Sequence, residues 1–305
     1  MTRALGYAPP VDGEIELVIL AGGLGERFGG DKALAGLGPR GELLLEFSLF
    51  DAKAAGVERV HLVVPPGGEA RFGAELRERV RGPHLNFVEQ APEQPYAGLD
   101  TPGRERPWGT AHAAAIASAC ASGPCVVVNA DDWYGPRAIR DLAAADLGDA
   151  DAALVTWPLA ATLSEHGPVN RGLCRVEDET LSSIRECVGI EREGEVIRGQ
   201  LGPESIRLEP DTPISLNCWL LGPRAQTWLE TSTRTFVETH RTDPRIEAQL
   251  PTLLMAGIEA VGLRVRTVAR GQVWAGVTFR ADAERVRQLL REACEAGELP
   301  NPLWS

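Results

Sequence analysis

The stretch ELVILAGGLGERFGGDK, residues 16–32, joins an apolar run to a loop that carries five glycines, Arg27 and Lys32. The apolar run predicts a buried strand of the kind found in parallel sheets that helices cover on both faces. Glycines that follow a strand let the backbone turn tightly and bring N–H groups within reach of phosphate oxygens, and the two cations add positive charge. The stretch therefore predicts a loop that holds phosphates at the edge of such a sheet.

Two common phosphate-binding motifs do not fit this loop. The dinucleotide fingerprint Gly-x-Gly-x-x-Gly fails because Phe28 stands where the third glycine belongs after Gly23 and Gly25. The P-loop needs Gly-Lys-Ser/Thr after four intervening residues, and GGDKAL does not supply it.

Strands and helices are expected to alternate around this loop. The expected strands are 15–20, 59–64, 85–90 and 125–130, and the expected helices are 46–55, 68–80 and 109–121. This order predicts an α/β fold with a doubly wound, mostly parallel, Rossmann-like sheet and helices on both faces. Strands at 152–159 and 214–222 and helices at 224–230 and 246–256 follow in a less regular second half.

We expect one large domain over residues 15–282, with a loose segment, residues 1–14, before it. The helix 283–295 has Val286, Leu289, Leu290 and Cys294 on one face, which predicts that residues 283–305 pack on the domain as a helical cap and tail.

Composition limits the possible partners. The net charge is −12 and no block of Lys and Arg is present, which argues against binding of nucleic acid. The start lacks a secretory signal, and the long uncharged run 113–130 is broken by Ser118, Gly123 and Pro124, so no membrane span is expected. Six cysteines without a Cys-x-x-Cys pair favour buried free thiols and a cytoplasmic location.

Lysine is rare in the chain. Only Lys32 and Lys53 are lysines among 31 basic residues. This bias favours a functional role for Lys32 at the end of the glycine loop, whereas Lys53 fits a solvated helix position.

A pair of aspartates follows the apolar strand in VVVNADDWYG, residues 126–135. Carboxylates at the mouth of such a strand require a compensating cation, because burying unpaired charge is unfavourable by several kcal/mol. Asp131 is the first candidate. Adjacent residues on an extended strand point to opposite faces, which counts against Asp132 unless the chain turns there.

The glycine loop resembles the signature of the sugar nucleotidyltransferases, Ala-Gly-x-Gly-x-Arg followed by a lysine. The matching residues are Ala21, Gly22 or Gly23, Gly25, Arg27 and Lys32. RPWGTAHA resembles the family's Gly-Thr-Ala segment, which implies that Gly109 and Thr110 border the nucleotide; a plain helix cap is the alternative for Thr110. The resemblance also implies a contact from the Gln90 amide to the nucleobase.

Further stretches follow in the family's order, so that the resemblance spans residues 16–304. They are VNRGLCRVE, ISLNCWLLGP, EAQLPTLL and VWAGVTFRADAERV followed by LPNPLW. The residues implied to bind substrate are Trp133, Tyr134, Gly172 and Asn217.

The resemblance implies that a nucleoside triphosphate and a sugar 1-phosphate, or a similar small phosphate ester, react to give a nucleotide sugar and pyrophosphate. Arg27 and the loop N–H groups would hold the β- and γ-phosphates. Lys32 would bridge the α-phosphate and the incoming phosphate, and Mg²⁺ on Asp131 would offset charge on the α-phosphate. A homo-oligomer is compatible with the sequence.

The chain departs from the family near its end. Many members supply a second metal carboxylate from a Trp-x-Asp segment, but here Trp274 and Ala275 are followed by Gly276. We expect Asp282 to be the second acidic ligand, with a helix N-cap before Ala283 as its alternative role.

Two other function classes remain open. A metal-dependent glycosyltransferase would also use an Asp-Asp pair, but it has no need of Arg27 and Lys32 for pyrophosphate release. A noncatalytic nucleotide-sensing relative would keep the fold and lose charged site residues, whereas here Arg27, Lys32 and Asp131 are all present.

Overall fold

The structure is a computed structural model that describes residues 14–23, 34–93, 101–277 and 281–304. Of these residues, none belongs to a helix with the length and hydrophobicity that a membrane crossing requires. All six cysteines carry free thiols, and Cys125, Cys174, Cys187 and Cys218 are buried.

The first half of the chain forms the parallel sheet that its alternating pattern predicts. Its strands are β1 (Glu16–Leu20), β2 (Arg59–Val64), β3 (His84–Glu89) and β4 (Cys125–Asn129), in the order β4-β1-β2-β3. All three pairings are parallel. The connecting helices are α1 (Leu44–Ala54), α2 (Gly68–Leu76) and α3 (Thr110–Ser118). Hence this part of the prediction is confirmed.

The sheet as a whole is not mostly parallel, and that part of the prediction is wrong. The long central strand β11 (Pro213–Leu221) runs antiparallel to β4 on one side and to β6 (Ala152–Pro158) on the other. Beyond β6 lies β12 (Val265–Arg270), which is parallel to it. The chain reaches β11 from a series of tight turns and not through a crossover helix, so it enters the sheet in the opposite direction.

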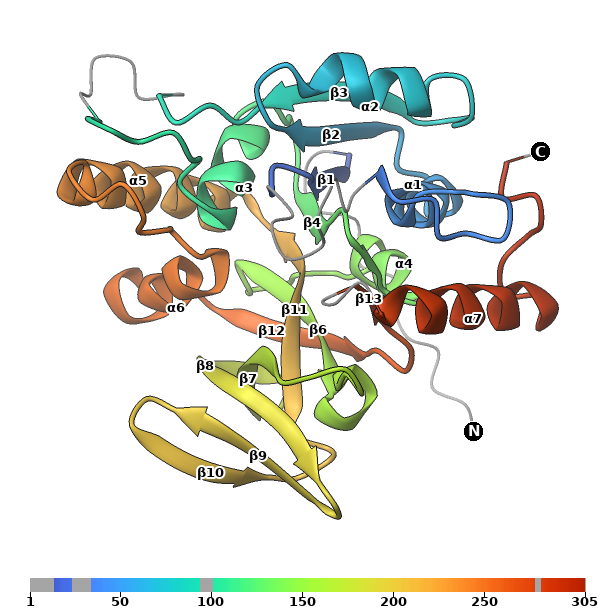
Figure 1. Ribbon diagram of the computed structural model, residues 1–305. Coiled ribbons are helices and arrows are strands. Elements are labelled where there is room, and N and C mark those ends of the chain that lie inside the picture. The colour runs from blue at the N-terminus through green and yellow to red at the C-terminus, as the bar shows by residue number, and fades with distance from the viewer. Residues whose placement is uncertain (1–13, 24–33, 94–100, 278–280, 305) are drawn as a thin grey trace, which may run out of the picture.

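The second half closes into a small barrel-like ring of strands. β7 (Val169–Glu177) pairs with both β11 and β8 (Thr180–Glu193), and β8 in turn contacts β12, which returns to β11 through β6. β9 (Val196–Leu201) and β10 (Glu204–Leu208) extend β8 as a meander at the bottom of Figure 1. The sequence alone predicts no helix or strand over the charged residues 178–207.

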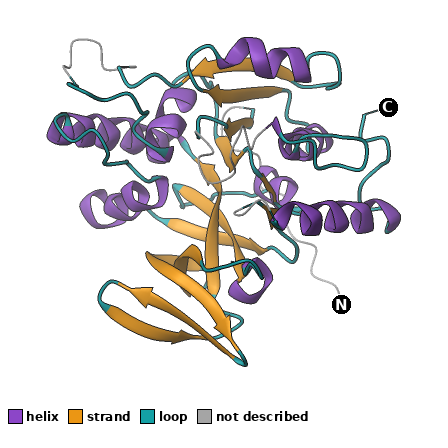
Figure 2. Cartoon of the chain, viewed as in Figure 1, coloured by secondary structure: helices purple, strands orange, loops and turns teal. Residues whose placement is uncertain are grey.

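Helices cover both faces of the sheet (Figures 1 and 2). α5 (Pro223–His240) and α6 (Leu250–Val261) pack with α3, whereas α4 (Ala138–Ala143) packs with α1. Side chains alternate accordingly along β1, because Leu17 and Ile19 belong to one hydrophobic cluster and Val18 and Leu20 to the other. A short 3-10 helix, Leu159–Thr162, follows β6.

The C-terminal helix α7 (Asp282–Glu295) packs as a cap. Val286 and Leu290 are buried in a third cluster together with Phe47 of α1. The indole nitrogen of Trp304 donates a hydrogen bond to Glu46, at 2.9 Å, which fastens the tail to α1.

A buried carboxylate lies at the start of β1, at the end of the strand opposite the glycine loop. Glu16 is 1% exposed and contacts the His61 ring at 2.6 Å, and it accepts a hydrogen bond from the Ser122 backbone N–H at 2.8 Å. Burial raises the pKa of Glu16, but the hydrogen bonds from His61 and Ser122 outweigh it, so the pKa lies below its ordinary value.

This pKa predicts how stability depends on pH. Because the folded-state pKa of Glu16 is depressed, its contribution is fully present above the unfolded-state value of 4.5 and is lost as pH falls through the folded-state value. Urea unfolding at pH 7, 5 and 4 should show a shallower acid loss of unfolding free energy in Glu16→Gln than in wild type. An equal acid slope would contradict this account, and Glu75→Gln, on an exposed part of α2, is the matched control.

Candidate functional site

The loops after β1 and β4 leave the sheet side by side. The two strands are adjacent and parallel, and Leu20 at the end of β1 lies opposite Asn129 at the end of β4. Ala21, Gly22 and Gly23 therefore begin next to the segment that carries Asp131. Ligands of open α/β sheets bind at this carboxyl edge.

A cavity of about 320 Å³ opens beside these strand ends. Its size lies within the range of small-molecule sites, which is roughly 300–1,000 Å³. The lining residues are Asn129, Asp131, Asp132, Asn170, Arg171, Gly172, Ile184, Glu186, Ser215, Leu216, Asn217, Gln249, Pro251, Thr252, Trp274 and Val277. They come from both halves of the chain, so the fold brings together three of the predicted residues, Asp131, Gly172 and Asn217.

The chain turns at Ala130 and Asp131 before it enters the short strand β5 (Asp132–Trp133). As a result Asp132 lines the same cavity as Asp131. The sequence counts against Asp132 unless the chain turns at this point, and the chain does turn here. Its Oδ2 accepts a hydrogen bond from the Asn129 amide at 2.8 Å and lies 3.3 Å from the Tyr134 hydroxyl.

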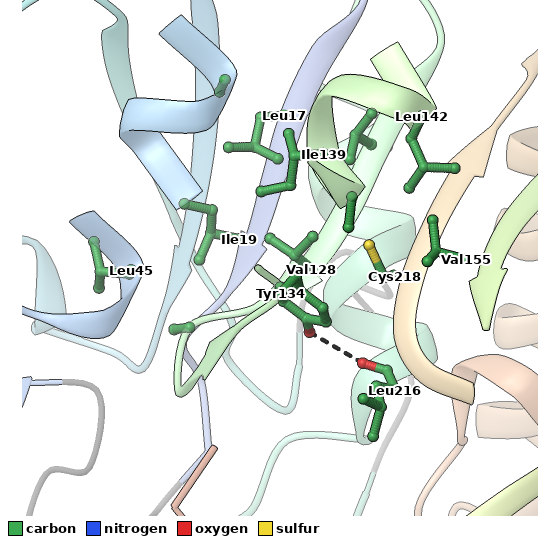
Figure 3. Packing of buried hydrophobic residues seen from close by; sticks show 14 of the residues in the cluster. Leu17, Ile19, Leu45, Val128, Tyr134, Ile139, Leu142, Val155, Leu216 and Cys218 are labelled. Atoms are coloured by element: carbon green, nitrogen blue, oxygen red, sulfur yellow. Dashed lines mark hydrogen bonds between the residues drawn. The ribbon is translucent and has the colours of Figure 1, made fainter. Parts of the chain in front are cut away.

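Trp133 and Tyr134, predicted to bind substrate, lie in the core. They are 1% and 2% exposed, and neither lines the cavity. The Tyr134 hydroxyl donates to the backbone oxygen of Leu216 at 3.0 Å, which links the turn after β4 to β11 (Figure 3). Burial, followed by the charge of Asp132, raises the pKa of Tyr134 well above its ordinary value. The structure gives both residues a packing role.

Asn217 lies where β11 is interrupted by a bulge. The register of β11 against β6 shifts between Ser215 and Trp219, and Asn217 has a φ of 58°. Non-glycine residues seldom adopt this left-handed conformation, although asparagine does so more readily than most. Such strain is typical of functional positions. The bulge places Asn217 in the cavity wall.

Arg171 is a half-buried cation between the cavity and a second, smaller pocket. Burial lowers its pKa to about 10, while the charges of Asp132 and Asp282 act in the opposite direction. Its guanidinium donates to the backbone oxygens of Thr162 and Asn170 and lies 5.0 Å from the centre of the Trp274 ring. The described lining of the cavity contains three carboxylates, from Asp131, Asp132 and Glu186, and one cation, Arg171. The described lining therefore carries a net negative charge.

Gln90 joins the glycine loop to the start of α3. Its amide nitrogen donates to the backbone oxygen of Gly109 at 2.9 Å and lies 3.3 Å from His112 Nδ1, and its oxygen lies against Gly22. Gly109 has a φ of 93°, and a Cβ there would lie 2.8 Å from the backbone oxygen of Ala248, so glycine is required. The predicted contact from Gln90 to a nucleobase stays a prediction, since its amide nitrogen is engaged within the protein.

Thr110 caps a helix other than its own. Its hydroxyl accepts a hydrogen bond from the Leu250 N–H at 2.9 Å, at the start of α6, and contacts Gln249 Oε1 at 3.3 Å. No side-chain cap is present on α3. Because Gln249 lines the cavity, Thr110 connects the Gly109 segment to the cavity wall.

Asp282 lies in the smaller pocket, whose volume is about 20 Å³. It is the first residue of α7 and 6% exposed, and its Oδ1 accepts a hydrogen bond from Ser164 Oγ at 2.8 Å. The predicted cap before Ala283 differs from this arrangement, because the helix begins at Asp282 and has no side-chain cap hydrogen bond. Asp131 lines the larger cavity and not this pocket.

Three predicted residues, Gly25, Arg27 and Lys32, lie outside the described residues. Within the described ranges, His, Cys, Asp and Glu form no group of three or more with the arrangement of a metal site.

The sequence reading missed several lining residues that stand inside the stretches it had singled out. Asn170 and Arg171 directly precede Gly172, Gln249 precedes the Leu-Pro of α6, and Trp274 is the second residue of VWAGVTF. Their position within those stretches was the available signal.

A search of curated proteins gives no match. Among solved structures, the inositol-1-phosphate CTP transferase from T. maritima matches with a TM-score of 0.62 and 16% identity, over 92% of this chain and 96% of that one. A protein from Bacillus anthracis assigned as a glucose-1-phosphate thymidylyltransferase, in complex with a sucrose, matches with a TM-score of 0.60 and 12% identity, over 91% of this chain and 96% of that one. HddC from Yersinia pseudotuberculosis matches with a TM-score of 0.55 and 14% identity, over 90% of this chain and 98% of that one.

These likenesses establish the fold, which is the mixed α/β fold of nucleotidyltransferase structures. The family model of the MobA-like NTP transferase domain matches residues 17–192, more than half of the chain, and confirms the resemblance seen in the sequence. The chain belongs to the MobA-like NTP transferase family.

Proposed function

We propose that the protein joins a nucleoside triphosphate to a sugar 1-phosphate or a similar small phosphate ester, giving a nucleotide sugar and pyrophosphate. The observation that carries this proposal is the cavity itself. It lies beside the carboxyl ends of β1 and β4, and it combines Asp131 with the amides of Asn170, Asn217 and Gln249. Amides and carboxylates suit a ligand that offers several hydroxyl groups.

In the proposed reaction a phosphate oxygen of the acceptor attacks the α-phosphorus, and the bond from that phosphorus to the β-phosphate oxygen breaks as pyrophosphate departs. No protein nucleophile is required. The chain's work is to position the two substrates and to balance charge. Arg27 and the backbone N–H groups of the glycine loop are proposed to hold the β- and γ-phosphates, and Lys32 to lie between the α-phosphate and the acceptor phosphate.

The donor set beside β4 fits a divalent cation of the kind that the family implies. Carboxylate oxygens are the ligands that Mg²⁺ prefers, and the described lining of the cavity has an excess of carboxylates. Asp131 is the proposed ligand. When bound, Mg²⁺ would offset charge on the phosphate under attack. Gln90, Gly109 and Thr110 are proposed to hold the segment that borders the nucleotide, through the hydrogen bonds described above.

A screen for pyrophosphate release tests this proposal. Five nucleoside triphosphates are combined with a panel of sugar, cyclitol and other phosphate esters in the presence of Mg²⁺. We expect pyrophosphate only where both substrates are present. A metal-dependent glycosyltransferase would instead consume a nucleotide sugar without releasing pyrophosphate, and a noncatalytic relative would bind nucleotide without turnover.

Asn217 offers a prediction that separates binding from stability. Asn217→Gly removes the side chain and accepts a φ of 58°, whereas Asn217→Ala removes the side chain and keeps the unfavourable backbone, at about 1 kcal/mol. Both variants should raise the KM for the phosphorylated acceptor, and only the alanine variant should lower the melting temperature. Wild-type KM in Asn217→Gly would remove Asn217 from the acceptor site.

A further inference from the structure

A short strand opposite Asp132 leaves room for its carboxylate. β13 (Ala275–Gly276) pairs antiparallel with β5, and Gly276 lies directly opposite Asp132. A Cβ at Gly276 would lie 2.3 Å from Asp132 Oδ1 and 2.2 Å from the Trp274 ring. A side chain at position 276 would therefore displace the carboxylate or the indole.

Asp132 is held in this place by its neighbours. It is 8% exposed, and Asn129 and Tyr134 contact its Oδ2. It lines the large cavity together with Asp131. The described lining of this cavity also holds one cation, Arg171, so its carboxylates are in excess, and carboxylate oxygens are the ligands that a divalent cation prefers.

The pocket that contains Asp282 is much smaller than the cavity that Asp131 and Asp132 line. A pocket of about 20 Å³ has room for roughly one water molecule. Mg²⁺ usually keeps several of its waters in protein sites, and the 320 Å³ cavity at Asp131 and Asp132 can accommodate them whereas the smaller pocket cannot. The Asp282 carboxylate instead accepts the hydrogen bond from Ser164 Oγ, and its negative charge favours the charged form of Arg171.

We propose that Asp132, and not Asp282, joins Asp131 as the second acidic ligand of the divalent cation, and that Gly276 is the residue that makes room for it. This inference rests on the proposed function for the presence of a cation. In this assignment the two carboxylates come from adjacent residues of the chain, whereas Trp-x-Asp proteins take them from distant segments. Asp282 becomes a positioning residue that balances Arg171.

Binding of Mn²⁺ to the full-length protein tests the assignment without any need for turnover. Free Mn²⁺ is followed by electron paramagnetic resonance in titrations with no nucleotide present. We expect the dissociation constant to rise at least fivefold in Asp131→Asn and in Asp132→Asn, and to stay within twofold of wild type in Asp282→Asn. Asparagine at 132 can still accept the hydrogen bond from the Asn129 amide, and melting curves verify that each variant is folded.

Gly276→Ala is the second, independent variant, because it leaves both carboxylates in the chain and places a methyl group 2.3 Å from the present position of Asp132 Oδ1. We expect it to weaken Mn²⁺ binding as much as Asp132→Asn does. Wild-type Mn²⁺ binding in folded Asp132→Asn or Gly276→Ala, or a loss in Asp282→Asn equal to that in Asp132→Asn, would overturn the proposal. A lack of pyrophosphate release with this Mn²⁺ pattern intact would refute the proposed function and leave the cation site standing.

Discussion

Asp131→Asn is expected to lower metal-dependent turnover by about 100-fold or more while the melting temperature stays at the wild-type value. The amide cannot supply the anionic oxygen that Mg²⁺ prefers, so charge on the α-phosphate would no longer be offset. The side chain lies in the cavity wall at a turn and not in the hydrophobic core, which is why we expect folding to be unaffected. Steady-state kinetics over a range of Mg²⁺ concentrations, with thermal melts of the same samples, measures both quantities.

The matched control for this variant is Asp178→Asn. Asp178 is exposed in the turn between β7 and β8 and has a φ of 47°, which asparagine tolerates. It should leave turnover unchanged. Full activity in Asp131→Asn would contradict the assignment of Asp131 as a ligand of the cation.

Lys32→Arg is expected to lower kcat/KM by about tenfold or more, although the charge is kept. A planar guanidinium fork cannot take the place of a compact ammonium between two phosphates. The chain provides its own control, since Lys53 is the only other lysine and is an exposed residue of α1 whose ammonium lies 5.7 Å from the centre of the Trp304 ring. Lys53→Arg should have no effect on kinetics.

A change of less than about threefold in Lys32→Arg would remove Lys32 from the site. Equal losses in the two lysine variants would indicate a general effect of the substitution and not a role in phosphate binding.

The parallel half of the fold could be predicted because its signals are local. β1, β2 and β4 are short, largely apolar runs, β3 is a short strand with Leu85, Phe87 and Val88 among polar residues, and a helix pattern separates each strand from the next. Strand direction in the second half is not encoded in this way. ISLNCWLL reads as a buried strand in either direction, and β11 is antiparallel because of the route by which the meander returns the chain to the sheet.

The site was predictable to a similar extent. Asp131 and Asn217 stand out as polar residues beside or within apolar strands, and both line the cavity. The sequence could not separate Asp132 from Trp133 and Tyr134, since the turn that directs the first to the cavity and the others to the core depends on the β5 and β13 pair. That pair forms only when residues more than a hundred positions apart meet.

The fate of labelled phosphates tests the central proposal most directly. One nucleoside triphosphate active in the pyrophosphate screen is labelled in separate experiments at the α- and at the γ-phosphate and incubated with the accepted phosphate ester. We predict that the α label appears in a nucleotide sugar or equivalent diphosphate-linked product and that the γ label appears in pyrophosphate, in equal amounts. A γ label found on the acceptor, or a diphosphate-linked product without labelled pyrophosphate, would contradict nucleotidyl transfer by this protein.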